Sequence, residues 1–392
     1  MRKTLKSNLG LINLSTILIL MMFLSFLKIV NMEYLNILGD FLLLSSLVVV
    51  FLVVIINHKV FLTVDKKLFF SLLPIFIISL IYFINVFVTV NPLVSLQRSI
   101  LIFFIAFAIC FFYKIGKIDY QGVLKDKLYY LLLMVLILIL SSYFVNPGFS
   151  SYQSFFLNPN AFGMYAALLF LSLIYLSGKN VKPLIFFLGL FFIFISSSRS
   201  SLLAYLSSLF FIIFGSYFYS NRRLYVSIIA FFIILAVAIV YFMAYLDLTN
   251  YNELFRLYSG KNLLSGRNEV WPFVLNLTQQ HPYFGWGGGV SLDDVSSFKF
   301  SSHNFYLHTA LQIGYFSILL IFIFYILFWL FIWRGKGNKD IYYANGLFIY
   351  LILIQNFEVT LLQNNLAMSV PVFCLISYIV GVNSSNREGS KL

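Results

Sequence analysis

Long apolar runs follow one another along the chain, separated mostly by short polar connections. They consist largely of Leu, Ile, Phe and Val, with Gly and Ser interspersed. A helix needs about 20 mostly apolar residues to cross a bilayer, whereas barrel strands are shorter and alternate in polarity. The pattern therefore predicts an all-α, polytopic integral membrane protein with about twelve transmembrane helices. The runs have these approximate boundaries: 9–30, 35–56, 68–88, 98–113, 128–145, 161–177, 183–196, 201–218, 224–245, 304–333, 341–357 and 366–382.

One connection is much longer than the others. Residues 246–303 separate the ninth run from the tenth, and they contain glycine clusters, two tryptophans and two histidines. Long ordered loops in compact proteins are usually functional. We therefore expect residues 1–392 to form a single membrane domain in which loop 246–303 carries part of the active site.

The composition excludes the main classes of soluble protein. Hydrophobic types make up 61% of the residues and charged types 10%, whereas soluble domains carry about 25% charged residues. Intrinsic disorder would require low hydrophobicity and high charge. The two cysteines, Cys110 and Cys374, lie in apolar runs, where packing is the expected role, so a disulfide scaffold is excluded as well.

The positions of Lys and Arg predict the orientation. If the N-terminus is cytoplasmic and the twelve runs alternate, nineteen of the 26 basic residues fall in cytoplasmic segments, as the positive-inside rule requires. Both termini are then cytoplasmic, and the first run stays as a span because no cleavage site follows it. The net charge of +13 reflects topology and contact with anionic membrane lipids. It requires no nucleic-acid partner.

The long loop contains the segment Ser265-Gly266-Arg267-Asn268-Glu269-Val270-Trp271, which has the pattern of a helix start. Ser265 or Gly266 can cap an amphipathic helix whose first residue is Arg267. A cation at this end is unfavourable, because the helix dipole is already positive there. The arrangement makes sense if the guanidinium and the free N–H groups share an anion. The alternative is a solvated arginine, or one that pairs with Glu269.

Two more arginines fall near the exterior membrane surface. Arg199 lies in the serine-rich turn 196–201 between the seventh and eighth runs, and Arg98 lies at the start of the fourth. An arginine at membrane depth costs about 2.5–3.5 kcal/mol on insertion scales, which favours a functional role for Arg199. The alternatives are a snorkelling cation at Arg199 and an ordinary span-end cation at Arg98.

The loop enters the tenth run through Ser302-His303-Asn304-Phe305-Tyr306-Leu307-His308. An imidazole can take up a proton near neutral pH, so His303 is a candidate general base. Asn304 and His308 share a helix face because they are four residues apart. All three side chains could instead cap or pack.

Three further motifs carry weaker signals. The segment His281-Pro282 followed by glycines 285–289 indicates a tight turn, Asn158-Pro159-Asn160 indicates a helix cap with a possible sugar contact, and Asp293-Asp294 is expected to be solvated and not to bind a metal. The exterior face therefore combines arginines, histidines, hydroxyls and aromatics with few acids. This chemistry suits an anionic lipid headgroup, such as a polyprenyl pyrophosphate, and a sugar, because arginines can hold and stabilise a pyrophosphate leaving group and a histidine can deprotonate an attacking hydroxyl.

Residues 155–333 resemble the O-antigen polymerase and ligase family of bacterial envelope enzymes. The resemblance lies in the order and spacing of individually weak motifs around a single long exterior loop. The matching motifs are Asn158-Pro159-Asn160, Ser198-Arg199-Ser200, Gly266-Arg267…Trp271, His281-Pro282…Gly285…Gly287, His303-Asn304…Leu307 and Gly314.

The resemblance implies a membrane glycosyltransferase of the bacterial cell membrane that needs no metal, cofactor or nucleotide sugar. Arg199 and Arg267 would contact the donor pyrophosphate, and His303 would activate the acceptor hydroxyl. Displacement at the anomeric carbon would invert its configuration and release undecaprenyl pyrophosphate. The remaining expected substrate-binding residues are Arg98, Asn160, Glu269, Trp271, His281, Asn304 and His308.

The motifs do not separate polymerases from ligases. The Lys-, Asn-, Ile- and Phe-rich composition resembles that of low-GC, Gram-positive bacteria, which favours a polymerase that joins undecaprenyl-pyrophosphate-linked repeat units into capsular or exopolysaccharide. Such an enzyme would work with a flippase and a chain-length regulator. The alternatives are a ligase that transfers finished glycan, a flippase for lipid-linked oligosaccharide, and a rod-shape-type polymerase that uses an exterior acid such as Glu253, Glu269 or Asp293.

Overall fold

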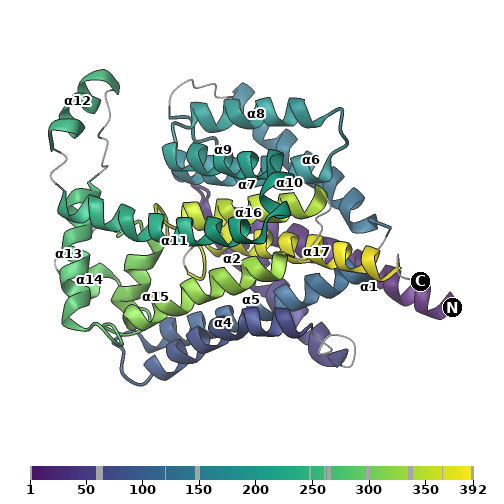
Figure 1. Ribbon diagram of the computed structural model, residues 1–392, viewed down its shortest axis with the longest axis horizontal. Coiled ribbons are helices and arrows are strands. Elements are labelled where there is room, and N and C mark those ends of the chain that lie inside the picture. The colour runs from purple at the N-terminus through teal and green to yellow at the C-terminus, as the bar shows by residue number, and fades with distance from the viewer. Residues whose placement is uncertain are drawn as a thin grey trace.

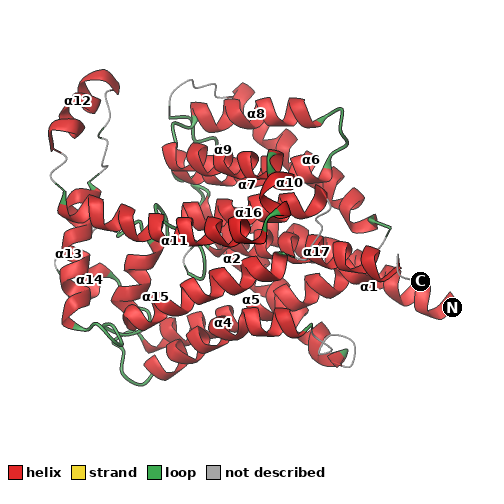
Figure 2. Cartoon of the chain, viewed as in Figure 1, coloured by secondary structure: helices red, strands yellow, loops and turns green. Residues whose placement is uncertain are grey.

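The computed structural model describes residues 2–58, 65–119, 121–145, 151–246, 249–259, 262, 266–296, 301–333, 339–363 and 365–389. Within these residues the regular structure is helical (Figure 2). One isolated bridge joins Val30 and Phe156. The elements are α1 (Arg2–Leu24), η1 (Ser25–Ile29), α2 (Glu33–Ile56), α4 (Lys66–Asn85), α5 (Pro92–Ile118), α6 (Val123–Val145), α7 (Pro159–Leu176), α8 (Lys182–Ile195), α9 (Arg199–Ile213), α10 (Gly215–Ser220), α11 (Arg222–Tyr245), α12 (Thr249–Ser259), α13 (Arg267–Gln280), α14 (Leu292–Val295), α15 (Phe305–Ile332), α16 (Lys339–Ile354) and α17 (Leu366–Gly389).

Every predicted apolar run coincides with a helix or with two consecutive helices. Helices form here because each N–H and C=O group in a bilayer must find its partner within the protein. Among the described residues, eight helices are long and apolar enough to cross a membrane, and α8 and α9 are shorter apolar helices. The all-α membrane architecture is confirmed, whereas the count of about twelve crossings stays a prediction.

Polar residues in the sequence mark several helix starts. The side chain of Asn158 accepts a hydrogen bond from the Ala161 amide at 2.8 Å and begins α7. Asn304 does the same for α15 by accepting from the Leu307 amide at 2.9 Å. Such side-chain caps satisfy N–H groups that have no partner within the helix. The expected cap at the Asn158 motif is thus present.

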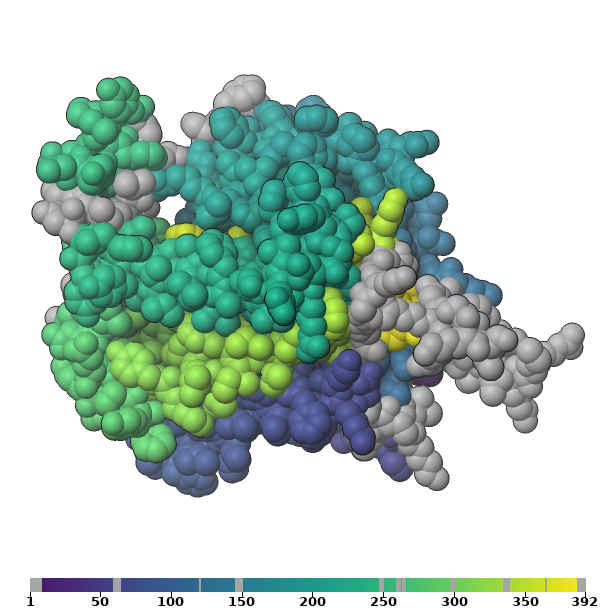
Figure 3. Space-filling model, viewed as in Figure 1, coloured from purple at the N-terminus to yellow at the C-terminus, as the bar shows by residue number. Residues whose placement is uncertain are grey.

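The helices form one bundle in which α5 packs against α17 and α4, α9 packs against α16, and α4 packs against α15. In Figure 1 both chain termini lie at the right, and α13 lies at the opposite end of the bundle. Helix α12 projects away from the bundle at the upper left, as the space-filling view also shows (Figure 3). The polar motifs of the sequence analysis gather at the α13 end.

Helix α15 is broken near this end, and the glycine-rich turn fills the break. Ile313 and Gly314 depart from helical geometry, with φ of 77° at Gly314. The amides of Trp286 and Gly287 donate to the carbonyls of Leu311 and Gln312 at 2.8 and 3.0 Å. These bonds replace helical ones that the break removes. The turn therefore fixes the geometry of α15, and these two amides are not free to bind a phosphate.

Candidate functional site

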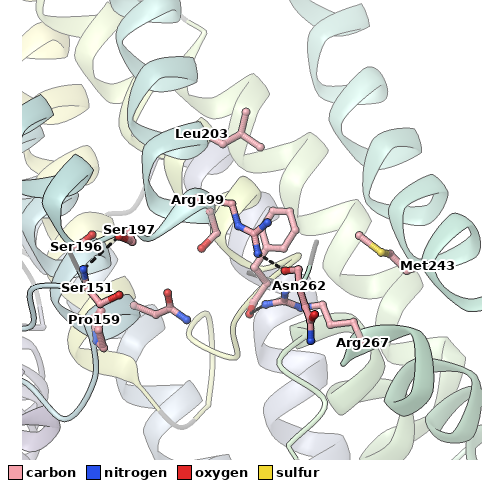
Figure 4. A pocket seen from close by; sticks show the side chains of 12 residues that line it. Ser151, Pro159, Ser196, Ser197, Arg199, Leu203, Met243, Asn262 and Arg267 are labelled. Atoms are coloured by element: carbon pink, nitrogen blue, oxygen red, sulfur yellow. Dashed lines mark hydrogen bonds between the residues drawn. The ribbon is translucent and has the colours of Figure 1, made fainter. Parts of the chain in front are cut away.

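A cavity of about 560 Å³ opens at the α13 end of the bundle. Its lining combines two arginines with serines, an asparagine pair and a few apolar side chains. The cavity is lined by Ser151, Pro159, Asn160, Ser196, Ser197, Arg199, Ser200, Leu203, Met243, Asn262, Arg267 and Phe357. Figure 4 shows the side chains of Arg199 and Arg267 converging on it from different helices. The lining contains no carboxylate, so the described part of the cavity is positively charged and suited to an anion.

Arg199 is the first residue of α9, directly after the serine-rich turn. Its Nη2 donates to the carbonyl oxygen of Asn262 at 2.8 Å, and the guanidinium lies 5.1 Å from the centre of the Phe255 ring in α12. Ser197 in the turn has φ of 58°, and its hydroxyl accepts a hydrogen bond from the Ser151 amide at 3.2 Å. The turn thus presents an exposed arginine and hydroxyl groups to the same space.

Arg267 is the first residue of α13, as expected from the sequence. The predicted cap position is taken by Gly266, whose φ is 77°, while Ser265 lies outside the described residues. The Arg267 Nη2 is 3.5 Å from the Phe357 carbonyl oxygen, and the guanidinium lies 5.5 Å from the centre of the Phe357 ring. Its Nε is buried and has no hydrogen-bond partner among the described residues. A buried donor of this kind is costly to leave unpaired, which suits a site that binds an acceptor-rich ligand.

The charges around Arg267 are partly balanced. Burial lowers the pKa of its guanidinium from the ordinary value, the Glu358 carboxylate raises that pKa, and the positive charge of Arg199 lowers it. Arginine nevertheless stays protonated in proteins, since its ordinary pKa is above about 12. The repulsion between the two arginines is an electrostatic strain that an anion bound between them would relieve.

His303 lies directly before α15 and has a positive φ. Its φ is 44°, in the left-handed region, which non-glycine residues occupy mainly when the surroundings impose it, often at functional sites. The ring Nδ1 lies 3.3 Å from Oε2 of Glu358, and the side chain is 55% exposed. His303 is therefore accessible on one side and held on the other.

Asn304 and Trp271 hold this segment rather than line the cavity. Asn304 is fully buried, caps α15 and donates from Nδ2 to the Asn356 carbonyl at 3.1 Å. Trp271 is also fully buried, and its indole N–H donates to the Ser302 carbonyl at 2.8 Å. Both were expected to contact substrate, and their burial gives them a structural task instead. Trp271 pairs the carbonyl of the residue before His303, and Asn304 pairs the Leu307 amide after it.

Arg98 and His308 belong to a second polar group, which is buried between α4, α5, α15 and the segment after α16. Tyr82 is at its centre: its hydroxyl donates to Oε1 of Gln312 at 2.9 Å and accepts a hydrogen bond from Nε2 of Gln363. His308 is 8% exposed, and its Nε2 lies 3.2 Å from Nε2 of Gln312. Arg98 interacts electrostatically with Tyr82 and His308. The structure therefore does not bring these two candidates into the cavity.

The other candidates are spread over the same end of the molecule. Asn160 lines the cavity at the start of α7. Glu269 is exposed in the first turn of α13. His281 is exposed at the end of α13, and its ring centre lies 4.2 Å from that of Trp286. Neither Glu269 nor His281 lines the cavity. The alternative in which Arg267 pairs with Glu269 is not seen among the described residues, where Arg267 contacts Phe357 instead.

The acidic alternatives are exposed as well. Glu253, Glu269 and Asp293 lie on the surface of the described loop, and none lines the cavity. The Asp294 carboxylate is engaged within the protein. Its Oδ2 accepts from the Ser291 amide at 2.8 Å and from Nδ2 of Asn91, which directly precedes α5, at 2.9 Å. These loop acids thus give no support to the rod-shape-type mechanism.

Sequence reasoning gave no role to Phe357 and Glu358, which follow α16, although Glu358 is one of the predicted exterior acids. They lie far along the chain from the arginines, in a stretch with no recognisable motif. The only signal was a single acid at the end of an apolar run. Their importance emerges because the turn after α16 packs against the turn that contains His303, through the bond from the Phe305 amide to the Gln355 carbonyl at 3.0 Å.

Two comparisons with known proteins find similarity to this chain. A family model described as O-antigen ligase matches residues 184–322, a segment that contains Arg199, Arg267 and His303. A ComP-specific O-oligosaccharyltransferase of Acinetobacter baylyi is 26% identical over 248 residues, which cover 58% of this chain and 44% of that protein. The match thus spans less than half the length of this relative. The chain is thus similar to O-antigen ligases over residues 184–322 and to an oligosaccharyltransferase over a longer stretch.

Proposed function

We propose that this protein transfers an oligosaccharide from a polyprenyl-pyrophosphate lipid to an acceptor hydroxyl on the outer face of the bacterial cell membrane, as an O-antigen-type ligase does. The observation that carries the proposal is that Arg199 and Arg267 line one cavity together with Phe357. His303 contacts Glu358, the residue that follows Phe357. The ligase description of the family model and the oligosaccharyltransferase relative favour transfer to an acceptor over the polymerisation of repeat units.

The residues suit a direct displacement. His303 takes the proton from the acceptor hydroxyl, and the acceptor oxygen forms a bond to the anomeric carbon. The bond from that carbon to the pyrophosphate oxygen breaks, and its electron pair leaves with undecaprenyl pyrophosphate. Arg199 and Arg267 stabilise the charge that develops on the leaving group. Attack from the opposite side inverts the anomeric configuration, and His303 returns its proton to water through its exposed side.

The test is to follow the glycan in the source bacterium after deletion of the gene. The deletion strain is complemented with the wild type, Arg199→Ala or His303→Ala, and glycan length and attachment are measured by gel electrophoresis and lipid extraction. Transfer as a ligase predicts that finished glycan accumulates on its lipid carrier in the deletion strain. We expect Arg199→Ala and His303→Ala to reproduce that accumulation, because removing a leaving-group stabiliser costs roughly 10²–10³ in rate and removing a general base costs roughly 10²–10⁴.

Other outcomes identify the competing functions. Collapse of long chains to single repeat units would show a polymerase. Loss of glycan at the cell surface, with lipid-linked donor accumulating on the cytoplasmic face of the membrane, would show a flippase. Two control variants replace exposed residues outside the cavity: Arg256→Ala in α12 and His58→Ala after α2. Normal glycan with His303→Ala at normal protein level would overturn the proposed mechanism.

A further inference from the structure

Glu358 occupies a place that the proposed chemistry does not yet use. We propose that Glu358 is a positioning residue for His303: its carboxylate accepts the Nδ1 proton of the imidazole, and the Nε2 lone pair is thereby left to deprotonate the acceptor hydroxyl. This inference rests on the proposed function. It also goes beyond the family match, since residues 184–322 do not include Glu358.

The contact between the two side chains is direct. The distance from His303 Nδ1 to Glu358 Oε2 is 3.3 Å, and the Glu358 side chain is only 12% exposed, compared with 55% for His303. This distance is longer than the 2.7–2.9 Å typical of a charge-assisted hydrogen bond. Catalytic hydrogen bonds are often long in a ligand-free enzyme and shorten in the substrate complex. The largely buried carboxylate thus lies at the Nδ1 edge of the more exposed imidazole.

The backbone holds the two residues at this separation. The Phe305 amide donates to the Gln355 carbonyl at 3.0 Å, and the side-chain Nδ2 of Asn304 donates to the Asn356 carbonyl at 3.1 Å. Gln355 in turn fixes its own turn, because its Oε1 accepts from the Leu361 amide at 2.9 Å. The contact between His303 and Glu358 therefore lies at the edge of a rigid junction between two helix ends. A surface ion pair between two flexible side chains would lack such a frame.

The same dipeptide also holds the donor-binding arginine. Phe357 contacts Arg267 with its ring and its carbonyl oxygen, and the next residue contacts His303. The Glu358 carboxylate raises the pKa of Arg267, against the effects of burial and of Arg199. One turn thus connects the group that binds the leaving pyrophosphate with the group that activates the nucleophile.

Fixing the tautomer has a clear chemical consequence. A neutral imidazole carries one proton, and only the unprotonated nitrogen can act as a base. When Nδ1–H donates to Glu358, Nε2 is the base. After proton transfer the imidazolium carries a positive charge, which the Glu358 carboxylate stabilises. The carboxylate gains no proton in this step, and the proton later leaves from Nε2 to water.

The experiment uses the full-length protein in nanodiscs. Lipid-linked donor extracted from membranes of the deletion strain is titrated with a fixed amount of membrane acceptor from the same strain, and release of undecaprenyl pyrophosphate is measured. Glu358→Ala is expected to lower kcat at least tenfold while the KM for the donor stays within about threefold, because the substitution removes no contact with the pyrophosphate. Glu358→Gln is expected to lower kcat less than Glu358→Ala, since its amide oxygen still accepts the Nδ1 proton. Glu358→Asp is expected to retain most of the kcat.

Three controls make the result decisive. Glu33→Ala removes an exposed acid at the start of α2 and should leave kcat unchanged. Binding of undecaprenyl pyrophosphate to each purified variant shows whether the cavity is intact. ¹⁵N NMR spectra of labelled histidine report the tautomer of His303 directly, and a shift toward the Nε2-protonated form is expected in Glu358→Ala.

The outcomes separate this inference from the proposed function. A kcat within twofold of wild type in Glu358→Ala, or an effect confined to the donor KM, would overturn the positioning role. If His303→Ala and Arg199→Ala abolish release in the same assay, the proposed function would still stand. No release of undecaprenyl pyrophosphate by the wild type would overturn the proposed function itself, and the inference with it.

Discussion

The guanidinium of Arg267 lies 5.5 Å from the centre of the Phe357 ring, and its Nη2 is 3.5 Å from the carbonyl oxygen of the same residue. A residue at the first position of the loop helix α13 is thus held by the turn after α16, 90 positions later in the chain. A planar guanidinium can stack on the ring and keep donors free for a phosphate, which an ammonium group cannot do as well. The relationship explains how a cation is held at the positive end of a helix.

We expect Arg267→Lys to weaken transfer and to make it sensitive to alkaline pH. The planar stacking contact with Phe357 is lost. Burial, opposed by Glu358 and aided by Arg199, lowers the pKa of Arg267, and the same surroundings would lower the pKa of a lysine from its ordinary value of about 10.4. Donor binding needs the charged form, which is present below the pKa and lost as the pH rises through it. The measurement is donor turnover between pH 6 and about pH 10, the range below the ordinary lysine value. An unchanged profile in Arg267→Lys would contradict the buried environment.

Replacing Trp271 with Phe should lower kcat and stability without weakening donor binding. The substitution keeps most of the packing of α13 but removes the indole N–H that donates to the Ser302 carbonyl. A buried carbonyl left unpaired costs about 1–3 kcal/mol, and the segment that positions His303 loses a support. Thermal unfolding in detergent and the affinity for undecaprenyl pyrophosphate check this prediction. A loss of affinity with full stability would instead indicate direct contact with the ligand.

Gly314→Ala should prevent normal folding of the α13 end. Gly314 has φ of 77°, and an added Cβ would lie 2.1 Å from the Tyr283 carbonyl oxygen. Backbone atoms cannot move aside as a flexible side chain can, and this region of φ and ψ is available essentially to glycine alone. The matched control is Gly178→Ala, where a Cβ meets nothing within 4 Å. Folded protein recovered after size-exclusion chromatography should fall for Gly314→Ala only.

Tyr82→Phe tests whether the second polar group acts independently of the cavity. The change leaves the Gln312 and Gln363 amides without the hydroxyl that joins them, which costs about 1–3 kcal/mol for each buried group left unpaired. We expect lower thermal stability but an unchanged affinity for undecaprenyl pyrophosphate. Loss of affinity equal to that of Arg199→Ala would show that Arg98 and its neighbours take part in donor binding after all.

Much of the architecture could be predicted from local patterns. The apolar runs predicted the helices, because in a bilayer backbone groups must be paired within each apolar segment. The helix starts at Asn158, Asn304 and Gly266 also followed from local sequence, since capping involves residues only a few positions apart. The three residues proposed to carry the chemistry, Arg199, Arg267 and His303, were identifiable because a charge or an imidazole stands out in an apolar chain.

The sequence alone determined which residues are unusual and at which helix ends they lie. Only the tertiary structure decided which of them meet. It brings Arg199 and Arg267 into one cavity, assigns Arg98 and His308 to a separate buried group, and places Glu358 against His303. These choices depend on how α4, α5, α13, α15 and α16 pack, and packing joins residues that are distant in the chain. Periodicity and spacing describe only neighbours along one helix, so the partner of His303 could not be read from them.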